Sequence, residues 1–162
     1  MKRLQIYLDT SVISHLDAPD RPDLMADTKK LWKDIQSGKF EIFISPINIL
    51  EIDACPEPKR ANLASWLQTT PYTLLQQTDE VLELAEKYLK AGIMPPKCTV
   101  DRLHIAYACV YNCDMIVSWN FEHMVNYKTI YGVKGANALA GYKEMPIYSP
   151  TMLVKGESSD DL

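Results

Sequence analysis

Three acidic residues that could do chemistry stand far apart in this chain: Asp9, Glu51 and Asp101. Asp9 directly follows an apolar run, and the other two lie in segments with helix-forming sequence. Burying an unpaired carboxylate costs several kcal/mol, so an acid next to core-forming segments needs a physical reason. If the three side chains converge, they form a cage of hard oxygen ligands that suits Mg²⁺ or Mn²⁺.

The elements that must position these acids alternate along the chain. Strands are expected at Leu4–Leu8, Phe40–Ile44, Tyr72–Leu75, Asp114–Ser118 and Pro146–Tyr148. Helices are expected at Val12–Leu16, from Leu24 to Gly38, at Pro46–Asp53, at Lys59–Leu67, from Thr78 to Gly92, at Val100–Tyr111 and, more weakly, at Ala136–Tyr142. This alternation predicts an α/β fold whose parallel sheet carries helices on both faces. In such a sheet, ligands bind beyond the carboxyl ends of the strands.

Each acid also has a structural alternative. Asp9, Thr10 and Ser11 are all residue types that cap helices, so capping and catalysis are equally consistent with this segment. Asp101, in the first turn of its helix, would complement the helix dipole. Glu51 is flanked by apolar residues and could simply point outward to solvent.

Length and composition predict one soluble globular domain. The chain has 162 residues, of which 47% are hydrophobic and 23% are charged. We expect residues 1–154 to form the domain and residues 155–162 to form a flexible acidic tail. No segment has the length of a membrane span and the N-terminus lacks the form of a signal peptide, so a cytoplasmic location is expected.

Cysteine usage and charge exclude some classes of protein. The four cysteines include no C-x-x-C pair, so we expect small packing residues and neither disulfides nor a zinc site. The net charge of −4 counts mildly against a free-standing nucleic-acid binder, which usually shows a basic patch. A bound divalent metal would add positive charge of its own.

Four short motifs together are more specific than any one of them. They are Tyr7–Ile13 (YLDTSVI), Asn48–Ile52 (NILEI), Asp101–Ala108 (DRLHIAYA) and Met115–Phe121 (MIVSWNF). In order, spacing and strand–helix context they resemble the PIN domain family, the metal-dependent ribonucleases that include VapC-type toxins. The resemblance extends from Ile6 to about Val125.

The resemblance implies a three-layer α/β/α sandwich with an acidic cluster that binds Mg²⁺ or Mn²⁺. By position, Asp9, Glu51 and Asp101 match three catalytic, metal-binding acids of the family. The fourth acid usually follows the fourth strand, and here that place is Asn120. An asparagine still offers a neutral oxygen ligand, but it removes one negative charge. Glu122, two residues on, could substitute or could be an ordinary surface side chain.

Residues near the acids are candidates for holding the substrate. Ser11 matches a small polar position that helps to hold the metal site or the substrate in the family. His123 and Asn126 follow Asn120 on one short turn and could contact phosphate. His104 shares a helix side with Asp101, and an interior, hydrogen-bonded histidine is its commoner role.

The resulting hypothesis is a metal-dependent ribonuclease that uses metal-activated water. A narrower form of this hypothesis is the toxin of a toxin–antitoxin pair. The family implies RNA as substrate, an antitoxin protein as possible partner, and a possible homodimer through the helices between Leu24 and Leu67, where Trp32 and Trp66 could instead be core. The alternative is a degenerate PIN domain that binds RNA or a protein without cleavage. A phosphotransferase with Asp9 as nucleophile is a third hypothesis, but such enzymes carry a second aspartate where this chain has Ser11.

Overall fold

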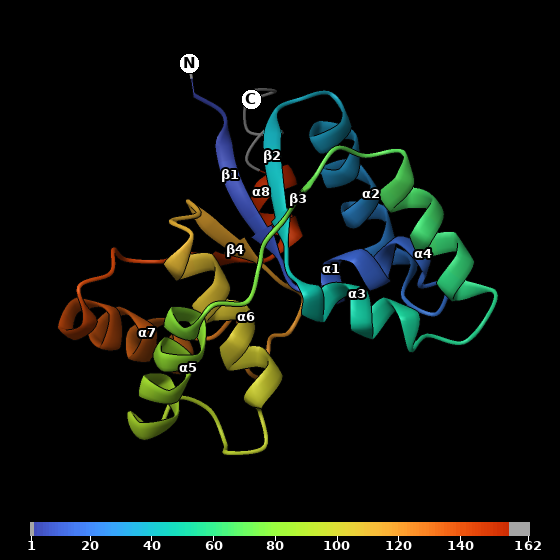
Figure 1. Cartoon of the computed structure of the whole chain (residues 1–162). Coiled ribbons are helices and arrows are strands. Elements are labelled where there is room, and N and C mark those ends of the chain that lie inside the picture. The colour runs from blue at the N-terminus through green and yellow to red at the C-terminus, as the bar shows by residue number, and fades with distance from the viewer. Residues whose placement is uncertain (1, 156–162) are drawn as a thin grey trace.

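A five-stranded parallel sheet organises the molecule. The computed structural model describes residues 2–155. The strands are β1 (Leu4–Leu8), β2 (Phe40–Ile44), β3 (Thr73–Leu74), β4 (Met115–Val117) and β5 (Ile147–Tyr148), and their spatial order is β3-β2-β1-β4-β5. All five predicted strands are present, and the predicted parallel sheet is confirmed (Figure 1).

Helices connect successive strands in the described part of the chain. They are α1 (Thr10–Ser14), the 3₁₀ turn η1 (His15–Asp17), α2 (Pro22–Gln36), α3 (Pro46–Asp53), α4 (Lys59–Gln68), α5 (Asp79–Lys90), α6 (Thr99–Val110), α7 (Tyr127–Ala140) and α8 (Pro150–Lys155). The start of α3 follows the sequence signals closely, because Ser45 and Asn48 form a capping box around the proline at the first helical position.

The central strands β1, β2 and β4 bury side chains on both faces of the sheet, which makes the fold a three-layer α/β/α sandwich, as predicted. Tyr7 of β1 points into a core formed with α5, α6 and α7, whereas its neighbours Ile6 and Leu8 point into a second core. That second core is formed with α1, α2, α3, α4 and α8. Figure 1 shows α5, α6 and α7 on one side of the sheet and α1 to α4 on the other.

The largest difference between the predicted and the observed elements concerns α7. The sequence predicted only a weak helix at Ala136–Tyr142, but α7 begins nine residues earlier, at Tyr127. Gly132 and Gly135 weaken the local helical preference, so the pattern is faint before Ala136. Packing explains Gly132, because a Cβ there would lie 3.0 Å from Cγ1 of Ile93. The helix ends at Gly141, whose φ of 86° suits glycine.

Other expectations have mixed outcomes. Helix α6 begins at Thr99, one residue before the expected start at Val100, and its N-terminal flanking residue is Cys98. Trp32 is fully buried and donates a hydrogen bond to Thr70 Oγ1 at 2.9 Å, so it belongs to the core.

The predicted tail, residues 155–162, lies outside the described residues except for Lys155, which ends α8. In residues 2–155, no helix has both the length and the apolar character to span a membrane.

The strand order sets the place of the site. From β1 the chain moves outward to β2 and β3, and it then returns to place β4 on the other side of β1. The order therefore reverses between β1 and β4, and this reversal is the switch point at which open α/β sheets bind ligands. Asp9 and Ser118 directly follow these two neighbouring strands.

Candidate active site

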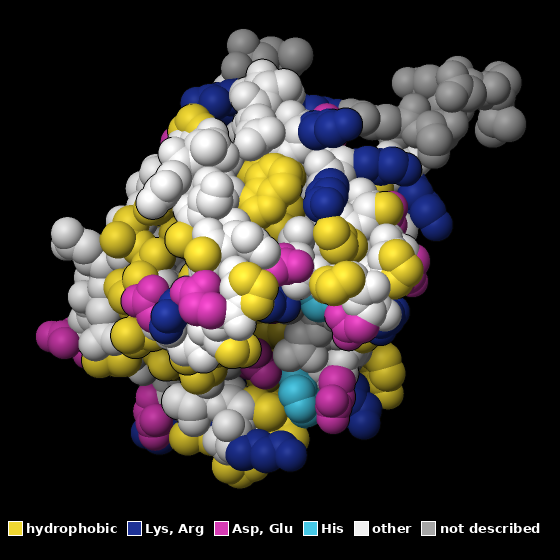
Figure 2. All heavy atoms as spheres, turned by 90° about the vertical axis from the view of Figure 1, so that its right-hand side faces the viewer, with side chains coloured by type: hydrophobic (Ala, Val, Ile, Leu, Met, Phe, Trp, Pro, Cys, Tyr) yellow, Lys and Arg dark blue, Asp and Glu magenta, His cyan; other side chains and the backbone are white. Residues whose placement is uncertain are grey.

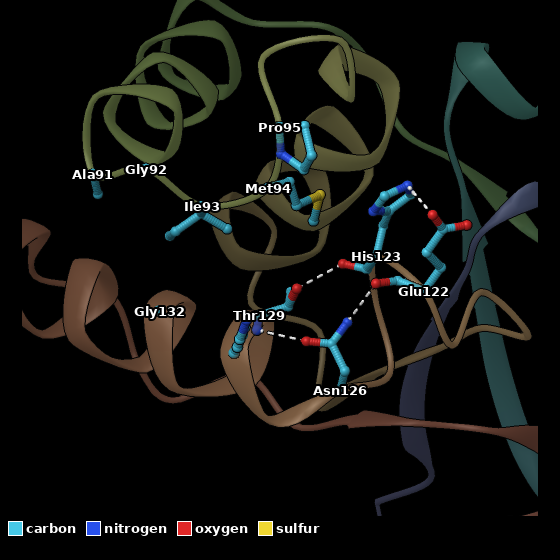
Figure 3. A pocket seen from close by; sticks show the side chains of 11 residues that line it. Ala91, Gly92, Ile93, Met94, Pro95, Glu122, His123, Asn126, Thr129 and Gly132 are labelled. Atoms are coloured by element: carbon cyan, nitrogen blue, oxygen red, sulfur yellow. Dashed lines mark hydrogen bonds and ion pairs between the residues drawn. The ribbon is translucent and has the colours of Figure 1, made fainter.

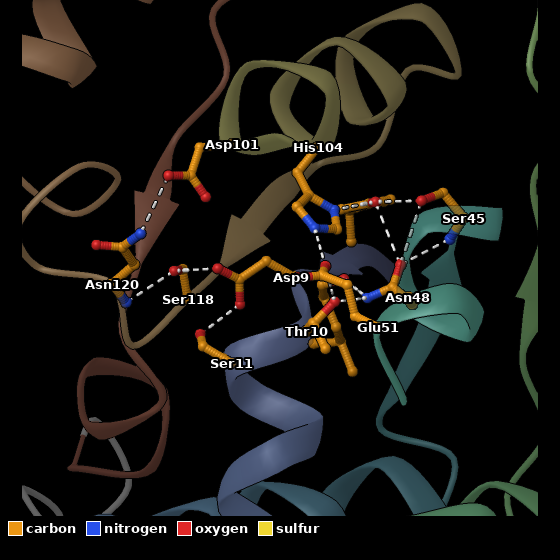
Figure 4. A network of polar contacts seen from close by, with 12 residues as sticks. Asp9, Thr10, Ser11, Ser45, Asn48, Glu51, Asp101, His104, Ser118 and Asn120 are labelled. Carbon is orange, nitrogen blue, oxygen red and sulfur yellow. Dashed lines mark hydrogen bonds and ion pairs between the residues drawn. The ribbon is translucent and has the colours of Figure 1, made fainter. Parts of the chain in front are cut away.

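Asp9 is buried and held by two serine hydroxyls. Its side chain lies at the carboxyl end of β1, where the residue is only 3% exposed. Ser11 Oγ donates to Asp9 Oδ1 and Ser118 Oγ donates to Asp9 Oδ2, each at 2.5 Å (Figure 4). The backbone N–H of Asp9 donates to Val117 O of β4, so the two strand ends are locked together. Both carboxylate oxygens therefore have fixed directions.

The backbone in turn orients the two serines. The N–H of Trp119 donates to Ser11 Oγ, and the N–H of Asn120 donates to Ser118 Oγ, both at 2.9 Å. Each hydroxyl thus accepts from the chain after β4 and donates to Asp9. Ser11 makes no capping hydrogen bond in α1, so its hydroxyl serves Asp9 and not the helix end.

Burial is the dominant influence on the Asp9 carboxyl. Desolvation raises the pKa of Asp9, because the charged form loses contact with water. The nearby His104 and the hydrogen bonds from Ser11 and Ser118 act in the opposite direction. The fold thus holds a carboxyl group in an environment that penalises its charge, and a bound cation would relieve that penalty.

Glu51 reaches the same region from the second turn of α3. Its Oε1 accepts a hydrogen bond from Thr10 Oγ1 at 2.6 Å and lies 3.2 Å from His104 Nε2. The side chain of Glu51 is 42% exposed. The hydrogen bond with His104 lowers the pKa of Glu51, and Thr10 acts in the same direction against the effect of burial. The structure therefore leaves Glu51 partly exposed but turns its Oε1 toward Thr10 and His104.

A buried polar chain stands behind Glu51. His104 is buried and its Nδ1 lies 2.6 Å from the hydroxyl of Tyr7, which donates to Ser45 Oγ at 2.8 Å. His104 therefore joins α6 to β1 and α3, and its other ring nitrogen fixes Glu51 (Figure 4). The expected interior, hydrogen-bonded role of His104 is confirmed, but its partners were not predicted, because they are far from it along the chain.

Asn48 completes this support. Its Nδ2 donates to Leu8 O at 3.0 Å and to Thr10 Oγ1 at 3.2 Å, while its Oδ1 accepts from the N–H of Ser45. The same side chain thus caps α3 and ties it to the end of β1. The Ser-Pro-x-Asn segment contains the signal for the cap, but not for the tie to β1.

Asp101 approaches from the first turn of α6 and is less tightly held. Its Oδ2 faces Asn120 Nδ2 at 3.4 Å, a long hydrogen bond. Desolvation raises the pKa of Asp101, and the nearby carboxylate of Glu51 acts in the same direction. His104 and His123 act in the opposite direction. Asp101 is thus electrostatically linked to Glu51 without touching it.

The amide of Asn120 bridges two partners. Its Oδ1 accepts from the N–H of His123 at 3.0 Å, and its Nδ2 faces Asp101. The side chain therefore turns a donor toward the acid, and its oxygen toward the following turn. Only the remaining lone pair of Oδ1 is left for a metal ion.

The three acids line one cavity of about 360 Å³, together with Ser11, His104 and Asn120. Among residues 2–155, however, no three His, Cys, Asp or Glu side chains stand close enough together to hold one metal ion. Two oxygens are available, since Glu51 Oε2 and Asp101 Oδ1 accept no hydrogen bond from the described residues. The donor set fits a hard cation chemically, but the carboxylates must approach one another to share it.

The other predicted substrate contacts lie elsewhere. His123 and Asn126, with Glu122, line a second cavity, of about 500 Å³ (Figure 3). Asn126 is the N-cap of α7, since its Oδ1 accepts from Thr129 N at 2.9 Å and its Nδ2 donates to Glu122 O. The structure thus groups Ser11 with the three acids, and it places His123 and Asn126 in the lining of the second cavity.

Comparisons with known proteins add no family assignment. The chain matches no protein-family model and no curated protein sequence. The likeness to the PIN domain family therefore remains a prediction that rests on the motifs and on the geometry described above.

Proposed function

We propose that this protein is a metal-dependent ribonuclease of the PIN type that acts on cytoplasmic RNA. One observation carries the proposal: three acids from three distant segments line a single cavity at the switch point of a parallel sheet. An acid that only caps a helix acts locally, so capping alone would not bring acids from three distant segments into one cavity. The resemblance of the motifs supplies the choice of RNA as the substrate.

Asp9, Asp101 and Glu51 would hold a Mg²⁺ or Mn²⁺ ion, with Asn120 as a neutral oxygen donor. A bound divalent ion lowers the pKa of a water molecule and offsets the charge of the phosphate. Asp9 contributes a carboxylate whose two oxygens are fixed by serines, which limits the reorganisation needed at the site. The proposal needs no serine or cysteine nucleophile.

Glu51 is the residue placed to orient the attacking water. His104 and Thr10 both hold Oε1, so Oε2 is free to accept a hydrogen bond in the cavity. Because this anchoring favours the ionised form of Glu51, the side chain stays an acceptor at neutral pH. Asp101 adds a second negative charge from the opposite wall of the cavity.

The decisive experiment combines metal binding with RNA cleavage. Titration calorimetry with Mn²⁺ should show a site in the wild type that Asp9→Asn removes, and RNA cleavage should disappear in the same variant and in excess EDTA. The matched control is Asp20→Asn, which makes the same chemical change at an exposed acid that lines neither cavity. Cleavage that survives in Asp9→Asn, or in EDTA, would refute the proposal.

A degenerate PIN domain that binds RNA or a protein without cutting is the second candidate. Two observations favour it: Asn120 turns a hydrogen-bond donor toward Asp101, and the carboxylates stand apart. This hypothesis expects no Mn²⁺ binding that depends on the carboxylates, together with retained binding of RNA or of a protein. The calorimetric comparison of the wild type with Asp9→Asn thus separates the two candidates.

Toxin function and dimerisation are further parts of the proposal. An antitoxin would insert a basic side chain into the acidic cavity, which its charge favours. The dimer would form through helices α2 to α4. Trp32 of α2 is buried and could not contact a second copy, whereas Leu50 of α3 is exposed and could. Figure 2 shows apolar, acidic and basic side chains intermixed on one face of the molecule. Light scattering of the purified protein would show whether it is a monomer or a dimer.

A further inference from the structure

The second cavity lies beside the acid cavity and has no role in the proposal so far. Residues 91–95, between α5 and α6, form one part of its lining, and the turn before α7 with the first turns of α7 forms the rest. The two cavities flank the turn that carries Asn120 and His123, which are joined by a 3.0 Å hydrogen bond. A chain-like ligand could therefore pass from one cavity to the other.

The loop side of this cavity is apolar and firmly supported. Ile93, Met94 and Pro95 contribute the apolar lining, and Figure 3 shows the imidazole of His123 beside Met94 and Pro95. The buried guanidinium of Arg102 donates to Pro95 O and to Pro96 O, each at 2.8 Å. Because this cation is bonded to the loop carbonyls, the loop is held in place before any ligand arrives. An apolar slot beside an imidazole suits a flat aromatic ring.

The α7 side offers positive charge. Lys128 lines the cavity, is exposed, and forms no hydrogen bond or ion pair with the other described residues. Helix α7 contains Lys128 and Lys134 but no acidic residue, in a chain whose net charge is −4. The one acid in the lining, Glu122, is exposed and lies 3.6 Å from His123 Nε2. The cavity can therefore accept an anion at Lys128.

Two tyrosines extend this region along the helix. Tyr127 and Tyr131 are each 68% exposed, and they stand one helical turn apart on α7. Tyr131 follows Lys128 by three residues, so the two side chains adjoin on the helix surface. Exposed aromatic rings next to a lysine form the stacking surfaces on which single-stranded nucleic acid is bound. A free nucleotide would fill the cavity but would leave the tyrosines unused.

We propose that the second cavity and the Tyr127–Tyr131 side of α7 bind the single-stranded RNA nucleotides that flank the one being cut. One base enters the slot between residues 93–95 and His123, Lys128 contacts phosphate, and the tyrosines stack the bases that follow. This inference rests on the proposed nuclease function, because it assumes that the scissile phosphate lies in the acid cavity.

RNA binding without cleavage tests this inference directly. A short fluorescein-labelled single-stranded RNA is titrated in EDTA, and its anisotropy is followed for the wild type, Lys128→Gln and the double variant Tyr127→Ala/Tyr131→Ala. The controls are Lys30→Gln on α2 and Tyr72→Ala before β3, two exposed side chains remote from this cavity. Thermal unfolding of each variant verifies that the fold is kept.

We expect the tyrosine variant to weaken binding on the order of tenfold or more, as for the loss of stacked bases. Lys128→Gln should reduce the slope of log Kd against log salt by about 0.7, the value for one phosphate contact with a single strand. The two controls should match the wild type. In Mn²⁺, KM should rise in both α7 variants while kcat stays unchanged.

Two outcomes would overturn the inference. One is RNA affinity that is the same in the wild type and in both α7 variants, and the other is a wild-type protein that binds no single-stranded RNA. Neither outcome touches Mn²⁺ binding that depends on Asp9, which is measured in the same preparations. A failed subsite is therefore distinguishable from a failed nuclease.

Discussion

The two walls of the acid cavity differ in how firmly they hold their carboxylates. On the β1 side, Asp9 has both oxygens bonded at 2.5 Å, and Glu51 is anchored by two partners. On the α6 side, Asp101 has one long contact, at 3.4 Å, with Asn120. The cavity thus has a rigid half, formed by Asp9 and Glu51, and a loose half, formed by Asp101 and Asn120. A metal ion would draw the loose half toward the rigid one.

The largest expected effect comes from Asp9→Asn. Metal-dependent cleavage should fall by more than about a hundredfold, beyond the loss typical of outer-shell partners of a metal site. Stability without metal should rise, by a few degrees in Tm, because the variant removes a charge that burial disfavours. An RNA-cleavage assay in Mn²⁺ measures the first effect, and scanning calorimetry in EDTA measures the second. A variant that loses stability and keeps its activity would contradict the view that Asp9 is held for a metal ion.

The pH dependence of this stability gain has a definite sign. The folded-state pKa of Asp9 is above its unfolded value, so its ionisation destabilises the fold fully above the folded pKa and not at all below the unfolded one. The gain from Asp9→Asn should therefore be present at pH 7 and should vanish as the pH falls below about 4. Thermal unfolding in EDTA across this range tests the prediction.

The next effect should come from His104→Ala, which loosens the rigid half. Glu51 loses one of its two anchors, and the buried hydroxyl of Tyr7 loses a partner. We expect about 1–3 kcal/mol of lost stability and a ten- to hundredfold loss of activity. The control is Tyr7→Phe, which removes the same Tyr7–His104 contact but leaves Glu51 anchored. Equal losses of activity in both variants would show that His104 acts only through packing.

Ser118→Ala should have a smaller effect of the same kind. Asp9 keeps the hydroxyl of Ser11 but loses one of the two bonds that fix its carboxylate. A hydrogen bond to a charged group contributes about 1.5–3 kcal/mol, so roughly a tenfold loss of Mn²⁺ affinity is expected. Calorimetry measures it, and an affinity equal to that of the wild type would show that Asp9 needs no such fixing.

The smallest effect should come from Asn120→Asp, which adds a carboxylate to the loose half of the cavity. A carboxylate at this place can still accept from the N–H of His123, and it adds an oxygen ligand of full charge beside Asp101. We expect Mn²⁺ affinity to increase a few-fold and Tm in EDTA to fall slightly, because two acids then repel each other. Weaker Mn²⁺ binding would mean that residue 120 does not face the metal.

Local patterns predicted most elements of this fold. The bounds of β1, β2 and α3 agree with the sequence signals, because apolar runs, a Ser-Pro start and breakers coincide there. The pattern failed for α7, where Gly132 and Gly135 weaken the local helical preference and only Gly132 is explained by packing, against Ile93. The acids of the candidate site were found because carboxylates at strand ends are poor core residues. Of the residues that hold them, Ser11 was predicted, but the contacts of Ser118 and His104 were missed, because these contacts join residues roughly a hundred positions apart.

The sequence by itself determined the class of fold, the five strands and the three acids, since these depend on residue type and on spacing over a few residues. Only the tertiary structure decided that β4 lies beside β1, that two serines hold Asp9, and that Asn120 turns its NH₂ toward Asp101. Those features depend on which distant segments pair and on the direction of each hydrogen bond. Short-range periodicity contains neither kind of information.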